Sequence, residues 1–70
     1  MVTRDDVREA LASSDGWQST VVVATNTRRT ARSPMAHREE VYRILRKMAD
    51  DAEAECYRGM GNEVYWRRVR

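Results

Sequence analysis

Several residue types are scarce in this chain, and each shortage excludes a class of protein. Cys56 is the single cysteine and His37 the single histidine among 70 residues. One cysteine cannot form an internal disulfide, which is typical of chains that fold in a reducing compartment. One cysteine and one histidine also exclude a zinc site built in the usual way from several such ligands. We therefore expect no metal and no other cofactor.

Long apolar runs are missing as well. No stretch approaches the roughly 20 apolar residues of a membrane-spanning helix, and the N-terminus lacks the charged-then-apolar order of a signal peptide. The sequence thus predicts a cytoplasmic protein with no membrane partner. Apolar residues at 41% and charged residues at 34% are typical of a folded globular chain rather than a disordered one. A chain of 70 residues forms one domain with a thin core.

Catalytic arrangements are also absent from the sequence. We find no Ser-His-Asp arrangement, no glycine-rich phosphate loop and no cluster of metal ligands. The carboxylates lie at expected helix starts and in polar turns, where they need no catalytic explanation. We therefore predict that the protein is not an enzyme.

The charged residues are segregated along the chain. The formal net charge is only +2, but residues 1–16 carry −2, residues 28–47 carry +5, residues 50–55 carry −4 and residues 58–70 carry +3. Two basic segments indicate a polyanionic partner that contacts two parts of the fold. Twelve of the 13 basic residues are arginine, which suits bidentate contacts to phosphate and guanine. The alternative is charge that is spread over the surface for solubility.

Residues 34–52 form the clearest predicted helix. Ser33 offers a capping hydroxyl and Pro34 occupies the first helical position, which is the usual start signal. An apolar stripe at helical spacing consists of Val41, Leu45, Met48 and Ala52. The opposite face carries Arg43, Arg46 and Lys47. This pattern predicts an amphipathic helix that packs on the core and leaves positive charge outside.

Residues 1–16 are predicted to form a support helix. Thr3 can cap it, with Asp6 as the acid of a capping box. Residues 17–33 then hold a short second element and a basic loop. We expect Trp17 to anchor the core. The valine-rich run from Ser19 to Thr27 favours a strand by propensity, but Ser19 could equally cap a short buried helix, and periodicity does not separate the two.

The segment from Thr27 to Ser33 is polar and basic and is predicted to be an exposed loop. One interpretation is a solvated connection between two elements. The other is a phosphate-binding segment that uses Arg28, Arg29 and Arg32.

Residues 53–70 are predicted to form a β-hairpin. Glu53–Tyr57 alternates polar and small apolar residues, which favours a strand with Cys56 on its covered face. Arg58–Asn62 is a glycine-containing turn, and the segment from Glu63 to Val69 is rich in residues that favour strands. The pattern leaves open whether Tyr65 or Trp66 faces inward.

Three segments together resemble a known family. The stretch from Glu40 to Met48 resembles the recognition helix of bacterial and phage winged helix-turn-helix regulators. The acidic run from Asp50 to Glu55 is similar to their turn into the wing, and Gly59–Trp66 to their wing tip and return strand. The resemblance implies a single α+β domain of about three helices followed by a two-stranded β-hairpin wing.

The resemblance also implies a function. In this family the long helix enters the major groove, and the hairpin lies along the backbone or the minor groove. We therefore expect a double-stranded DNA-binding protein that acts in transcription regulation or as an architectural factor. The residues expected to contact DNA, with those of the basic loop included, are Arg28, Arg29, Arg32, Arg38, Tyr42, Arg43, Arg46, Lys47, Arg58 and Asn62.

A second hypothesis is a protein-interaction module on the same fold with no DNA affinity of its own. It is motivated by four acidic residues that DNA would repel, namely Asp50, Asp51, Glu53 and Glu55. A homodimer is also open, because association stabilises a chain with so small a core.

Overall fold

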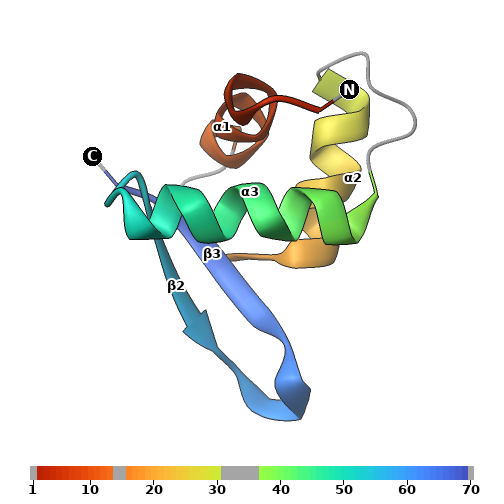
Figure 1. The fold of residues 1–70 in the computed structure, drawn as a ribbon. Coiled ribbons are helices and arrows are strands. Elements are labelled where there is room, and N and C mark those ends of the chain that lie inside the picture. Colours follow the sequence, from red (N-terminus) through yellow and green to blue (C-terminus); the bar gives the residue numbers. More distant parts are fainter. Residues whose placement is uncertain (1, 14–15, 31–36, 70) are drawn as a thin grey trace.

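A computed structural model describes residues 2–13, 16–30 and 37–69 of the chain. These residues form three α-helices and a three-stranded antiparallel sheet, so the predicted α+β class is confirmed. The elements in chain order are α1 (Arg4–Ala12), β1 (Gln18–Ser19), α2 (Thr20–Thr30), α3 (Arg38–Asp50), β2 (Ala54–Arg58), the short 3-10 turn η1 (Met60–Asn62) and β3 (Val64–Arg68). Figure 1 shows the helices grouped together and the β2–β3 hairpin extending away from them.

The hairpin predicted for residues 53–70 is confirmed. β2 and β3 pair without interruption from Ala54 opposite Arg68 to Arg58 opposite Val64. β1 pairs with the other side of β3, which makes β3 the central strand of the order β1-β3-β2. Because α2 follows β1 directly, this pairing fixes the start of α2 next to the hairpin.

The valine-rich run, for which strand and helix were both open, is a helix. Its start is capped by Ser19, whose hydroxyl accepts a hydrogen bond from the Val22 N–H at 3.3 Å. Val23, Ala24 and Thr27 follow at helical spacing and are fully buried. Burial of this face outweighs the weak helix propensity of valine, which amounts to only a few tenths of a kcal/mol per residue.

The support helix α1 begins as predicted. The Thr3 hydroxyl accepts from the Asp6 N–H at 3.2 Å, and the Asp6 carboxylate accepts from the Thr3 N–H at 3.0 Å. These two bonds form the expected capping box. The buried face of the helix consists of Val7, Ala10 and Leu11.

The core tryptophan is Trp66, and the prediction that Trp17 anchors the core was wrong. Trp66 is fully buried, and its indole N–H donates to the Thr20 hydroxyl at 2.8 Å. Trp17 is 38% exposed, and its ring contacts Tyr57. The central strand places Trp66 beneath the helices, whereas Trp17 precedes the short strand β1 and its ring packs against Tyr57 and the Arg67 guanidinium. Trp66, rather than Tyr65, is therefore the inward-facing aromatic residue of β3.

The helix predicted for residues 34–52 is shorter at both ends. Ser33 and Pro34 lie outside the described residues, and α3 starts at Arg38 after His37, whose backbone is extended. The stripe residues Val41, Leu45 and Met48 are buried as predicted. Ala52 is exposed, with φ of 61°, and so does not belong to the stripe.

The end of α3 has a defined hydrogen-bond pattern. The Glu53 N–H donates to the Met48 carbonyl at 2.7 Å and the Ala52 N–H to the Ala49 carbonyl at 3.1 Å. This is a Schellman arrangement, with Ala52 in the left-handed position that glycine usually occupies. It stops the helix and directs the chain into β2.

Cys56 is exposed, which contradicts its predicted place on a covered face. The helices cover β2 only at its first residue, Ala54, and the rest of this strand is exposed. The alternation of residue types correctly indicated a strand but did not show how far the helices reach along it.

The predicted turn at the hairpin end is confirmed, and its glycines have separate roles. Gly61 and Asn62 have φ of 76° and 67°, which a glycine and an asparagine adopt readily. Gly59 is in the extended region instead, but a Cβ there would lie 2.7 Å from the Tyr65 ring. Glycine at position 59 therefore lets the ring pack against the turn.

Candidate nucleic-acid interface

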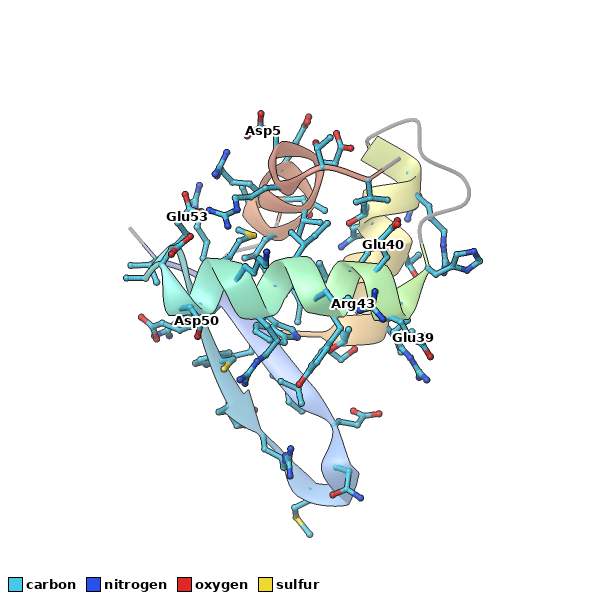
Figure 2. All side chains as sticks on the ribbon, viewed as in Figure 1. Asp5, Glu39, Glu40, Arg43, Asp50 and Glu53 are labelled. Carbon is cyan, nitrogen blue, oxygen red and sulfur yellow. The ribbon has the colours of Figure 1, made fainter. Side chains whose placement is uncertain are left out.

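A groove of about 690 Å³ lies between the first half of α3, the start of α2 and the end of the hairpin. It is lined from α3 by Arg38, Glu39, Tyr42 and Arg43, from β1 and α2 by Ser19, Thr20 and Val21, and from the hairpin by Gly61, Asn62, Glu63 and Val64. Figure 2 shows Glu39 and Arg43 near one end of α3 and Asp50 at the other end. The groove therefore combines two arginines and a glutamate of α3 with the hairpin end, which adds Glu63.

Four of the predicted DNA-contacting residues meet at this groove. They are Arg38, Tyr42, Arg43 and Asn62. Arg46 and Lys47 are exposed on the next turn of α3, and Arg58 is exposed at the end of β2. The expected long helix and hairpin thus contribute to one site.

The basic segment before α3 lies elsewhere. Arg28 and Arg29 are exposed in the last turn of α2, whereas the groove meets the first turn of that helix. An 11-residue helix spans about 16 Å, so these arginines are distant from the groove. Arg32 lies outside the described residues.

The prediction of an exposed loop from Thr27 to Ser33 was wrong for residues 27–30, and residues 31–33 lie outside the described residues. Residues 27–30 belong to α2, and Thr27 is fully buried. Its hydroxyl donates to the Val23 carbonyl at 2.8 Å, so this polar side chain is satisfied within the helix and can be buried without penalty. The loop prediction failed because threonine is a polar residue that a helix can bury in this way.

The cations of α3 are unpaired within the described part of the chain. No side-chain hydrogen bond or ion pair joins Arg38, Arg43, Arg46 or Lys47 to another described residue. The same helix exposes Glu39 and Glu40 in its first turn and Asp50 at its end. Positive charge is therefore concentrated in the middle turns of α3, with carboxylates at both ends.

The acidic turn after α3 is largely neutralised by arginines. Glu53 accepts from Arg8 at 2.9 Å and from Arg4 at 3.3 Å, and Asp51 accepts from Arg4 at 2.8 Å. The hydrogen bond and the charge of Glu53 raise the pKa of Arg8. Figure 2 shows Glu53 on the α1 side of the molecule.

Further along β2, Glu55 accepts from Arg67 at 2.6 Å. Three of the four acidic residues that DNA was expected to repel, Asp51, Glu53 and Glu55, thus have arginine partners. Their negative charge is compensated locally rather than directed at a ligand on α3.

The hairpin brings one carboxylate to the groove. Glu63 lines it and accepts a hydrogen bond from the Tyr65 hydroxyl at 2.8 Å. This bond and the negative charge of Glu63 raise the pKa of Tyr65 above its usual 10.0. The hydrogen bond from the phenol orients the Glu63 carboxylate at the groove.

Several groove residues were not predicted from the sequence. The hydroxyl of Ser19 comes from the end of β1, and the hydroxyl of Thr20 and the apolar Val21 come from the start of α2. Ser19 was considered only as a cap. The available signal was a pair of hydroxyl residues at a helix start, a place where backbone N–H groups favour anions.

Other kinds of site find no support in the described residues. They contain no group of three or more His, Cys, Asp or Glu that could hold a metal ion. None of the helices that they form is long and apolar enough to cross a membrane.

Comparison with protein-family models gives no match for this chain, and comparison with curated proteins gives none either. Its function is therefore inferred from its own geometry and charge.

Proposed function

We propose that this chain is a non-enzymatic double-stranded DNA-binding protein of the winged-helix type, a transcription regulator or an architectural factor. The single observation that carries the proposal is the pair Arg43 and Arg46. Both are exposed on α3 and have no side-chain partner among the described residues. Arg43 lines a groove that ends at the hairpin, and Arg46 follows on the next turn of α3.

The dimensions support this binding mode. α3 has 13 residues, which makes it about 20 Å long, and the major groove, about 12 Å wide, admits a helix. In this pose the middle turns of α3 enter the DNA major groove and bring Arg43, Arg46 and Lys47 to the base edges. Arginine pairs with the O6 and N7 of guanine or with a phosphate, and each good base contact contributes about 1–3 kcal/mol of discrimination.

The flanking residues suit backbone contacts. Arg38 begins α3, and Asn62 is on the hairpin, on the opposite side of the protein's own groove. Arg58 is exposed close to the same hairpin end. With α3 in the major groove, these side chains contact phosphates on either side or the adjacent minor groove.

The protein-interaction alternative has less support. That hypothesis was based on a cluster of acidic residues that would repel DNA. Three of these residues, Asp51, Glu53 and Glu55, form ion pairs with arginines of α1 and β3. The remaining member, Asp50, is exposed at the end of α3.

The test is a titration of the protein with random-sequence duplex at two salt concentrations. We expect binding that weakens steeply with salt, because each phosphate contact contributes about 0.9 to the slope of log K against log salt. An absence of duplex binding at low salt would overturn the proposal. A salt-independent affinity would do the same, because it would exclude phosphate contacts by α3 and the hairpin.

A further inference from the structure

We infer that two copies of this chain pair through the outer edge of β2, antiparallel, about a two-fold axis at Cys56. β2 is the terminal strand in the order β1-β3-β2. In Figure 1 its outer side faces away from the rest of the ribbon. An edge of this kind presents backbone N–H and C=O groups that can pair with another strand.

The outward groups follow from the ladder between β2 and β3. At one end the Val69 N–H donates to the Glu53 carbonyl at 3.3 Å, and at the other the Gly59 N–H donates to the Glu63 carbonyl at 2.8 Å. Hydrogen-bonded positions alternate in an antiparallel pair. Glu55 and Tyr57 therefore bond to β3. The residues that direct their backbone groups outward are Ala54, Cys56 and Arg58.

One register uses every outward group. With the axis at Cys56, this residue faces its own copy, and Ala54 faces Arg58 of the partner subunit. An axis at Glu55 would place two carboxylates directly opposite each other, which is destabilising. An axis at Tyr57 would leave Ala54 outside the pairing. The register centred on Cys56 is therefore the one that the strand favours.

The edge lacks several of the usual protections against such pairing. Natural edges are blunted by proline, by bulges, by lysine and other charged residues, or by a short strand. β2 has no proline or lysine, and its pairing with β3 runs through five residues without a bulge. The strand is short and carries the charges of Glu55 and Arg58. In the register centred on Cys56 these residues face Tyr57 and Ala54 of the partner subunit, so no like charges lie opposite each other.

The outer face of the sheet adds apolar surface at this edge. Trp17 contacts Tyr57 edge-on with ring centroids 4.7 Å apart, and Tyr57 stacks on Tyr65 at 5.2 Å. Tyr57 is 46% exposed and lies on the edge strand. In the inferred dimer it faces Glu55 of the partner subunit, and the two aromatic rows continue across one six-stranded sheet.

The contact is small, which sets the expected strength. Two five-residue strands, each with one aromatic residue on the edge itself, form an interface at or below the low end of the range for specific complexes. We therefore expect a weak dimer that requires high protein concentration. The dimer needs no DNA to form, because Arg43 and Arg46 are on α3 and not on this edge; of the residues proposed to contact DNA, Arg58 alone belongs to β2.

The test places opposite charges at position 56 in two separate variants and measures their association by sedimentation without DNA. Cys56 is exposed, so Cys56→Arg and Cys56→Glu leave the monomer fold intact, which circular dichroism checks. We expect the wild-type chain to dimerise, each variant alone to be monomeric at the same concentration, and their equimolar mixture to dimerise again. A wild-type chain that stays monomeric at high concentration, or a dimer that persists in both separate variants, would overturn the inference.

Mild oxidation tests the register separately. Cα atoms of a hydrogen-bonded pair lie about 5.5 Å apart, within the range for a disulfide. The wild-type chain should therefore form a Cys56–Cys56 dimer. The matched control is the double variant Cys56→Ser with Arg58→Cys, in which the thiol faces Ala54 of the partner subunit and should not cross-link. Equal cross-linking of the two proteins would contradict the register.

Discussion

The arginines of α1 and those of α3 have the same chemistry but different surroundings. Arg4 and Arg8 donate to carboxylates of the turn that follows α3. Arg43 and Arg46 have no side-chain partner among the described residues. The difference shows that counting basic residues along a sequence does not reveal which of them are available to a polyanion.

The cause is the path of the chain after α3. The Schellman turn at Ala52 directs the backbone back toward α1, so Asp51 and Glu53 lie beside Arg4 and Arg8. The acidic block therefore compensates arginines that are remote in sequence and leaves the basic block of α3 exposed. Charge neutralised on one side leaves the positive potential concentrated on the other.

The largest expected loss of duplex affinity comes from neutralising the two arginines of α3, Arg43 and Arg46. We expect Arg43→Gln with Arg46→Gln to weaken duplex binding at least about thirtyfold, because two lost contacts at about 1 kcal/mol each amount to that factor. The salt slope should fall by about 2. Fluorescence anisotropy with a labelled duplex measures both quantities.

The matched control is Arg4→Gln with Arg8→Gln, which changes the net charge by the same amount. It should weaken binding less than about threefold, through long-range electrostatics alone. Similar losses for the two double variants would remove the distinction between the two groups of arginines.

For thermal stability we expect the reverse order: the α1 double variant should lose more than the α3 double variant. We expect Arg4→Gln with Arg8→Gln to lower the thermal midpoint by about 2–5 °C, because the ion pairs with Glu53 and Asp51 are lost and surface pairs of this kind contribute little each. The α3 double variant should shift the midpoint by less than about 1 °C. Differential scanning calorimetry at low salt measures both values. A larger loss in the α3 variant would show that its arginines have structural partners.

A smaller change in duplex affinity is expected when a carboxylate at the protein's groove is neutralised. Glu39 lies one turn before Arg43 and lines the same groove. We expect Glu39→Gln to strengthen duplex binding about twofold, because one repulsive charge beside the DNA is removed. Glu9→Gln is the control, since Glu9 is also exposed but belongs to α1. Equal changes in both variants would indicate an effect of net charge only.

Local patterns predicted well where neighbours in sequence decide the structure. The capping box of Thr3 and Asp6 and the left-handed residues of the hairpin turn depend on contacts within a few positions. The buried stripe of Val41, Leu45 and Met48 follows from helical periodicity. Four of the predicted interface residues also meet at one groove, because they belong to two elements that were identified correctly.

The errors arose where burial depends on distant segments. Trp17 and Trp66 are chemically identical, and only the position of β3 beneath the helices decides which one forms the core. Similarly, Thr27 is buried because α2 continues through it and satisfies its hydroxyl, while Cys56 is exposed because no helix extends that far along β2. Nothing adjacent to these residues in the sequence carries that information.

The sequence by itself determined the first helix, the amphipathic division of α3 and the β2–β3 hairpin, because each depends on periodicity and short-range hydrogen bonds. It left the kind of element at α2 open and did not predict β1. Only the tertiary structure decided the pairing of charges and the choice of core tryptophan. The contacts that decide them include pairs of residues more than 40 positions apart, such as Arg4 and Asp51, or Thr20 and Trp66. Their approach follows from how the helices and the central strand pack together.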